Sequence, residues 1–327
     1  MKNIFSSFLL LSILCGSFSS CLNKETPVPL KPAGQETVGD VELADDYRWQ
    51  VYYSLKNNTV VGKNLFTSWD LGFETSPRGN RIILNGAKFR MVAYRTGKQD
   101  FAAVTIADTI GVASQIDMPS GSLDSTAIGD WKNGDVYILH RGVDELAADL
   151  GMRKIQFVSV DATKYVVRFS ALNGADEKTL EIPKDEKYNF CYLSFDGGGK
   201  TLTVEPPKTE WDIVFSKYTY LYYDLDMRYS VVGCLLNHFN TSAGEDTASK
   251  LFATIDLEKA ASVKLSSLVS TIGFEWKSYD INAGKYSIDT SRYYIIHTQD
   301  EIFYKVRFID FYKSGVKGAP KWQYQRL

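Results

Sequence analysis

The chain of 327 residues has little of the chemistry on which enzymes depend, with three histidines, four cysteines and five methionines. His238 stands alone, while His140 and His297 occupy matching positions in two apolar segments. Packing and a backbone hydrogen bond explain such a repeated histidine better than catalysis does. Neither a His-x-x-x-His pair nor a Gly-x-Ser-x-Gly nucleophile motif occurs. We therefore predict a protein that is not an enzyme and has no catalytic or metal-binding residues.

Charge of one sign is also lacking, because the formal net charge is −2 and the sequence pI is about 6.0. The sequence has neither a basic stripe nor an acidic tail. Nucleic acid is therefore excluded as the main partner.

An apolar run near the N-terminus, Ile4 to Leu14, follows Lys2 and is too short to span a bilayer. Such a run is typical of a signal peptide, which we place at residues 1–20. The residues before Cys21 resemble a relaxed lipobox, in which this cysteine is lipidated and becomes the mature N-terminus. The alternative is a simple secretory signal with an incidental cysteine.

Residues 21–40 contain several prolines and few apolar side chains, so we expect a flexible tether. The protein would then be held at the outer membrane by lipid alone, more plausibly on the cell surface than on the periplasmic side. Cys191 and Cys234 remain for the folded part. An oxidising envelope allows them to form a disulfide, and two buried free thiols are the alternative.

Aromatic residues are abundant, with 20 Tyr and 18 Phe, and many stand in alternating runs that suit pleated sheets. Alternation predicts strands at Trp49–Leu55, Arg81–Leu84, Phe89–Tyr94, Lys164–Phe169 and Phe303–Phe311. Helical periodicity is confined to Val143–Leu150 and Leu257–Leu268. The expected class is all-β, built from antiparallel sheets.

One motif occurs twice, because Trp69-Asp70-Leu-Gly-Phe73 returns 142 positions later as Trp211-Asp-Ile-Val-Phe215. Tyrosine-rich runs precede both copies, and matching strands follow both. The later landmarks are 157 positions apart, so the second copy carries about fifteen extra residues near Tyr279–Ser291. Repeats of this length indicate two tandem domains, at 41–175 and 186–327, with a boundary in the polar stretch 173–187.

The repeated Trp-Asp motif has a structural interpretation. In an alternating strand, Trp69, Leu71 and Phe73 share one face and anchor a core. Asp70 then lies on the other face and is free to bond backbone amides.

The closing segment Tyr293–Tyr312, the Lys317-Gly318 turn, the Trp-Asp strand and the lipobox cysteine together resemble the HmuY-like haem-binding lipoproteins of Bacteroides-type bacteria. The resemblance covers about residues 188–327 and is looser in the first copy. It implies an antiparallel β fold that grips haem between loops and passes it to an outer-membrane transporter. In this family the iron is held by histidines or methionines.

The resemblance places Tyr279 where a second axial ligand is expected, and it offers no histidine or methionine near the first position, around 247–258. Met118 lies in the equivalent loop of the first copy, where an exposed methionine without a role is the alternative. His238 follows the second Trp-Asp motif. Two hypotheses follow: a protein that binds haem or a related porphyrin, or a module on the same fold that binds a glycan, a peptide or an outer-membrane protein.

Overall fold

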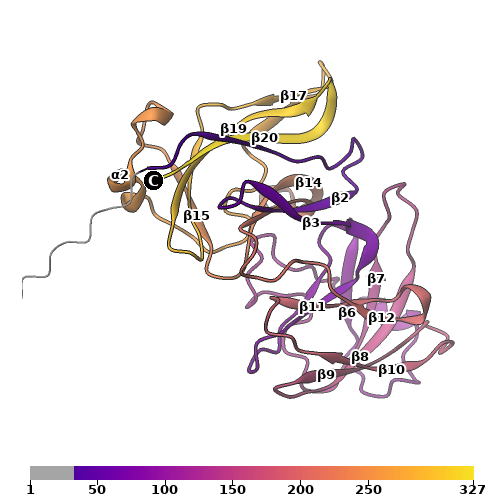
Figure 1. The fold of residues 1–327 in the computed structure, drawn as a ribbon. Coiled ribbons are helices and arrows are strands. Elements are labelled where there is room, and N and C mark those ends of the chain that lie inside the picture. Colours follow the sequence, from indigo (N-terminus) through magenta and orange to yellow (C-terminus); the bar gives the residue numbers. More distant parts are fainter. Residues whose placement is uncertain (1–32) are drawn as a thin grey trace, which may run out of the picture. The chain divides into compact units, whose positions relative to one another are not determined.

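Alternating apolar and polar residues form antiparallel strands throughout residues 33–327, the part of the chain that the computed structural model describes (Figure 1). The strands are β1 (Thr37–Asp40), β2 (Trp49–Ser54), β3 (Thr59–Leu65), β4 (Leu71–Glu74), β5 (Ile82–Leu84), β6 (Met91–Arg95), β7 (Val136–Arg141), β8 (Met152–Val160), β9 (Lys164–Ser170), β10 (Lys178–Pro183), β11 (Phe190–Ser194), β12 (Lys200–Leu202), β13 (Ile213–Tyr222), β14 (Met227–Leu236), β15 (Ser242–Asp246), β16 (Lys277–Asp280), β17 (Lys285–Ile288), β18 (Tyr293–His297), β19 (Phe303–Lys313) and β20 (Val316–Arg326). One short α-helix, α2 (Leu257–Ser262), interrupts them. The predicted all-β class is confirmed.

The sheets repeat one plan twice. Two five-stranded sheets have the orders β1-β20-β19-β18-β15 and β10-β9-β8-β7-β6. Two four-stranded sheets have the orders β12-β11-β4-β5 and β14-β13-β2-β3. The hairpin β16–β17 stands outside this plan, at the place where the second copy was predicted to carry extra residues.

Each Trp-Asp strand pairs with the tyrosine-rich strand of the other copy. Strand β4 pairs with β11, which places Gly72 opposite Tyr192. Strand β13 pairs with β2, which places Val214 opposite Tyr52. In Figure 1 the indigo strands β2 and β3 accordingly lie in one sheet with β14, and β13 stands between β2 and β14.

Two groups of sheets result from this exchange. Residues 66–205 hold the sheets of β4–β12 and are called here the middle lobe, whereas 33–65 and 206–327 together hold the other sheets and are called the outer lobe. The pairing therefore does not follow the expected limits of 41–175 and 186–327, because 49–65 belong to the sheet of β13 and 190–202 to the sheet of β4. The division into two folding domains stays a prediction.

The hydrophobic cores show the same exchange of hairpins between the two copies. In the outer lobe, Tyr53 and Leu55 from the β2 region pack into the cluster of Phe308, Trp276 and Trp322. The rings of Trp276 and Phe308 stack with centroids 4.1 Å apart, and Trp276 is fully buried. In the middle lobe, Leu193 and Phe195 join the cluster of Phe73, Phe157 and Tyr165. Each lobe therefore depends on a hairpin that the other copy supplies.

Asp70 and Asp212 bond the exchanged strands, as predicted for the motif. Asp70 accepts the backbone N–H of Phe195 at 2.8 Å, and Asp212 accepts that of Leu55 at 2.8 Å. The prediction that Trp69 shares a face with Leu71 and Phe73 is wrong. The chain bends at Asp70, so Trp69 packs against Tyr192 on the opposite face, with ring centroids 4.7 Å apart.

Three local predictions need correction. The tether was expected to reach residue 40, but 37–40 form β1 along β20, where Gly39 lies against the Trp322 ring. The stretch 143–150 is not helical, because Val143 and Asp149 form a β-bridge and Ala147 has φ +63°. The helix expected at 257–268 does form, but it ends at Ser262.

The predicted signal peptide, Cys21 and the first part of the tether lie outside the described residues. Within residues 33–327, no helix is both long and apolar enough to cross a membrane. Cys191 and Cys234 are free thiols, the first half-buried and the second buried.

A prediction for pH dependence arises at Glu205, which is buried and accepts backbone N–H groups from Asn189 and Phe190 at 2.6 and 2.8 Å. Burial raises the pKa of this carboxyl to about 7. Its stabilising contribution is therefore present at about pH 4.5 and is lost as the pH rises through 7. In the Glu205→Gln variant we expect a flatter fall of melting temperature between pH 5 and 8, measured by thermal denaturation. If the melting temperature of the variant fell with pH as steeply as that of the wild-type protein, the raised pKa of Glu205 would be contradicted.

Candidate functional site

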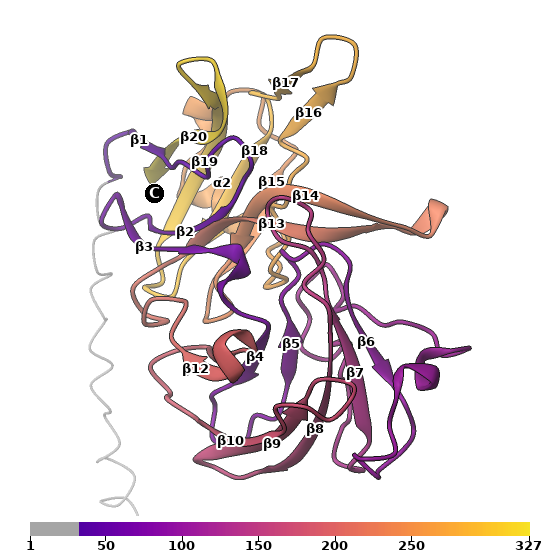
Figure 2. The ribbon, with the colours of Figure 1, turned by 90° about the vertical axis from the view of Figure 1, so that its right-hand side faces the viewer.

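A groove of about 840 Å³ opens between two hairpins of the outer lobe, β13–β14 and β16–β17. Figure 2 shows both hairpins, with β13–β14 as a long arm beside β16–β17. The lining residues share an aromatic or aliphatic character with a few polar groups among them: Tyr47, Lys217, Tyr222, Met227, Tyr229, Ser230, Val231, Val232, Phe274, Glu275, Lys277, Ser278, Tyr279, Ile281 and Tyr286. This volume falls within the range of about 300–1,000 Å³ that is typical of small-molecule sites.

Strand register brings the groove's tyrosines together. Tyr279 and Tyr286 are direct partners across the β16–β17 hairpin, with ring centroids 4.9 Å apart. Tyr222 and Tyr229 lie on neighbouring strands of the β13–β14 arm, with centroids 6.2 Å apart. Tyr279 is 54% exposed and Met227 is 42% exposed, so both present side-chain atoms to solvent. An exposed set of this kind is typical of a binding surface.

Two lysines lie in the same groove without a carboxylate partner among the described residues. Lys277 is 7% exposed and its ammonium group donates to the Val232 carbonyl. That group lies 4.4 Å from the centre of the Trp276 ring and 5.1 Å from that of Phe311. Burial lowers the pKa of Lys277 to about 7 and also lowers the pKa of Lys217. The groove is therefore an aromatic site with two lysines at its floor, and Lys277, only partly charged at pH 7, gains charge when an anion binds beside it.

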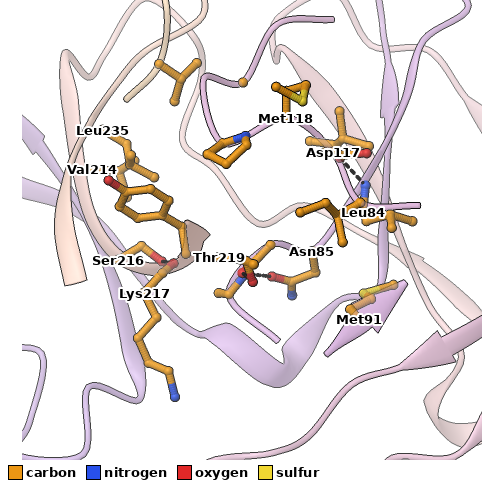
Figure 3. A pocket seen from close by; sticks show the side chains of 18 of the residues that line it. Leu84, Asn85, Met91, Asp117, Met118, Val214, Ser216, Lys217, Thr219 and Leu235 are labelled. Atoms are coloured by element: carbon orange, nitrogen blue, oxygen red, sulfur yellow. Dashed lines mark hydrogen bonds between the residues drawn. The ribbon is translucent and has the colours of Figure 1, made fainter. Parts of the chain in front are cut away.

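A second, smaller cavity of about 180 Å³ lies where β5, the loop 116–122 and β13–β14 meet. Figure 3 shows Met118 on one side of this cavity, with Leu84 and Leu235 among the other lining side chains. His238 also lines it, and its ring packs edge-on against Phe190 at 5.2 Å. Burial lowers the pKa of His238 to about 4, so the imidazole is neutral at pH 7.

The loop of this cavity is fixed by Asp117, which accepts the backbone N–H groups of Leu84 and Ala127, both at 2.7 Å. Burial raises the pKa of Asp117 to about 7. Lys217 lines the cavity as well as the groove, and Figure 3 shows its amino group pointing away from the cavity. The cavity is smaller than the usual range for ligands of drug size.

The structure thus places the predicted residues in two different sites. Met118 and His238 line the small cavity, whereas Tyr279 lines the groove. Sequence reasoning did not single out Lys277 or Tyr229 as site residues. Alternation along β14 and β16 could have placed Tyr229 and Tyr279 on sheet surfaces, but no sequence signal showed that the two hairpins face one groove.

The described residues include no group of three or more His, Cys, Asp or Glu side chains that is placed to hold a metal ion. The groove does contain side chains that can ligate haem iron, since tyrosinate and thioether are both known axial ligands. Tyr279 and Tyr229 supply the first kind and Met227 the second.

These features define an antiparallel β protein with an aromatic groove. Residues 198–324 match the family model described as HmuY protein, and over this segment the chain is HmuY-like. The match contains β13–β19, most of β20 and nearly all of the groove, and the resemblance inferred from the closing segment is confirmed there. No curated protein matches the chain.

Three solved structures are similar over most of their length. Apo PinO from Porphyromonas gingivitis is 7% identical, with 90% of this chain and 97% of that chain covered and a TM-score of 0.30. The apo HmuY analogue from Tannerella forsythia is 8% identical, with 91% and 98% covered and a TM-score of 0.27. A protein described as a lipoprotein from Bacteroides fragilis is 10% identical, with 90% and 92% covered and a TM-score of 0.23.

Proposed function

We propose that this chain is a surface lipoprotein of the outer membrane, anchored through Cys21, that binds haem or a related porphyrin and delivers it to an outer-membrane transporter. The observation that carries the proposal is the groove between β13–β14 and β16–β17, whose volume of about 840 Å³ and aromatic walls suit a flat apolar ring system. The family match over the same segment supports this ligand class.

The residues of the groove fit a haem group chemically. The rings of Tyr222, Tyr229 and Tyr286 would pack against the macrocycle, and Tyr279 or Met227 would hold the iron. Bound haem would supply an iron centre that absorbs strongly in the visible range. The small cavity around Met118 and His238, at about 180 Å³, has too little room for a porphyrin.

A haemin titration tests the proposal. The protein is expected to shift the Soret band of haemin to saturation at one equivalent, and Tyr279→Phe is expected to weaken binding about tenfold or more, because loss of the hydroxyl removes an iron ligand but keeps the ring. Tyr223→Phe is the matched control, since Tyr223 is 62% exposed on the same arm outside the groove lining. A haemin spectrum unchanged by the wild-type protein would refute haem binding.

A second candidate is a docking module for an outer-membrane protein, with a glycan or a peptide as other ligands of this class. It is favoured by the tips of the two hairpins, where Leu225 is 68% exposed and Ile281 is 83% exposed. Side chains of this size on projecting tips are typical of contact surfaces. Leu225→Asp is expected to abolish partner capture and to leave haemin binding unchanged. If the wild-type protein and Leu225→Asp captured the partner equally well, the hairpin tips would be excluded as its docking surface.

A further inference from the structure

Lys277 is an unusual residue to find at the floor of an apolar groove. Its side chain is 7% exposed, and its only hydrogen bond in the described structure goes to the Val232 carbonyl. A buried ammonium without a carboxylate costs several kcal/mol unless aromatic rings or an anion compensate it. The rings of Trp276, Tyr286 and Phe311, at 4.4, 5.6 and 5.1 Å, supply part of that compensation.

Lys217 adds a second positive charge to the same groove. Its ammonium lies 4.2 Å from the centre of the Phe66 ring, and it forms no ion pair within residues 33–327. The carboxylates that act on it, Asp46, Asp144 and Glu145, do so only through longer-range attraction. The one acidic residue of the groove lining, Glu275, forms no ion pair with either lysine in the described structure; it lies 3.7 Å from Arg292, which also binds Glu245 at 2.9 and 3.0 Å. The groove therefore has unpaired positive charge where its ligand binds.

From this arrangement we infer that the groove selects a flat aromatic ligand that carries an anionic group, and that Lys277, assisted by Lys217, pairs with that group. The inference rests on the proposed function, because it assigns the carboxylates of a porphyrin to these two lysines. Two of the three N–H donors of Lys277 remain for a ligand once Val232 has accepted one. A charge-assisted hydrogen bond in such a site is stronger than a neutral one.

The tyrosines and the lysines then have separate tasks. The tyrosine rings provide area for any macrocycle of the right shape, whereas the lysines distinguish a free acid from its ester. A neutral ligand would leave both ammonium groups buried beside an apolar surface without compensation, which makes its binding weaker. Specificity of this kind does not depend on iron, and so it can be separated from axial ligation.

The test compares protoporphyrin IX with its dimethyl ester on the wild-type protein, by porphyrin fluorescence in one solvent. The free acid is expected to bind about tenfold or more tightly, since only the free acid brings a carboxylate to the lysine ammonium groups. In Lys277→Met the preference should fall towards one, and in Lys217→Met it should fall in part. Lys285→Met, an exposed lysine on the same hairpin, is the matched control and should keep the preference.

The outcomes separate the two levels of the proposal. Equal affinity of the wild-type protein for acid and ester would overturn the role of the lysines and leave porphyrin binding intact. Binding of neither compound, together with an unchanged haemin spectrum, would overturn the proposed function as well. The comparison on the wild-type protein decides the matter even if a lysine variant fails to fold.

Discussion

Removal of residues 33–65 is expected to unfold the outer lobe and to leave the middle lobe folded. This segment supplies β2 and the residue after it, and Val51, Tyr53 and Leu55 are all at most 2% exposed in the core around Phe308. Burial of each such side chain contributes about 1.5–3 kcal/mol, so the three together match much of the 5–15 kcal/mol that holds a typical protein folded. Loss of Leu55 also leaves Asp212 without its backbone donor.

Hydrogen exchange on two equivalent strands measures the result. In the shortened chain, amides of β19 around Val306 should exchange rapidly, whereas those of β8 around Ile155 should stay protected. Two tandem domains with their boundary near 173–187 predict the reverse, because 41–65 would then belong with β8. A fragment of residues 66–205 alone is the complementary control and should keep the protection of β8. Protection of the β19 amides in the shortened chain would contradict the exchange of hairpins between the two copies.

The sequence could predict the strands but not their partners. Tyr52 and Tyr192 stand at equivalent places in the two copies, and each packs against the tryptophan of the other copy, with ring centroids 4.9 and 4.7 Å apart. A repeated motif makes both pairings chemically equivalent, so alternation and duplication indicate a sheet without specifying which copy completes it. Which copy supplies the partner strand depends on how the loops connect the strands. The residue pattern does not reveal those connections.

Other errors have local causes. Residues 37–40 look like tether because they are polar and contain glycine, yet a Cβ at Gly39 would lie 2.5 Å from the Trp322 ring, so glycine is what lets β1 lie against that ring. Nothing in the local sequence indicates that these residues pair with a strand that carries a distant tryptophan.

The site was predictable only in part. Tyr279 could be singled out by resemblance to a family, but its place in the groove depends on the approach of two hairpins. Lys277 could not be singled out, because a lysine in a polar, alternating segment is normally a solvated one. It is buried here with its ammonium group over the rings of Trp276 and Phe311, at 4.4 and 5.1 Å from their centres.

Replacement of Asp70 by alanine is expected to lower the free energy of unfolding by about 3–5 kcal/mol, the usual loss when one member of a buried ion pair is removed. Asp70 is fully buried, accepts Lys88 at 2.7 Å and Arg141 at 3.0 Å, and also accepts the N–H of Phe195. Burial lowers the pKa of Lys88, and attraction to Asp70 opposes that shift. Without Asp70 the Lys88 ammonium is buried without a close carboxylate.

The second copy provides the matched comparison, because Asp212 holds the exchanged strand through Leu55 but has no hydrogen-bonded cation among residues 33–327. Asp212→Ala should therefore cost less, about 1–3 kcal/mol for one orphaned buried donor. Urea unfolding of both variants measures the difference, and equal losses would show that the buried cations contribute nothing. Adding Lys88→Met to Asp70→Ala should then recover part of the loss, because it removes the uncompensated charge while the space is filled by an apolar side chain of similar length.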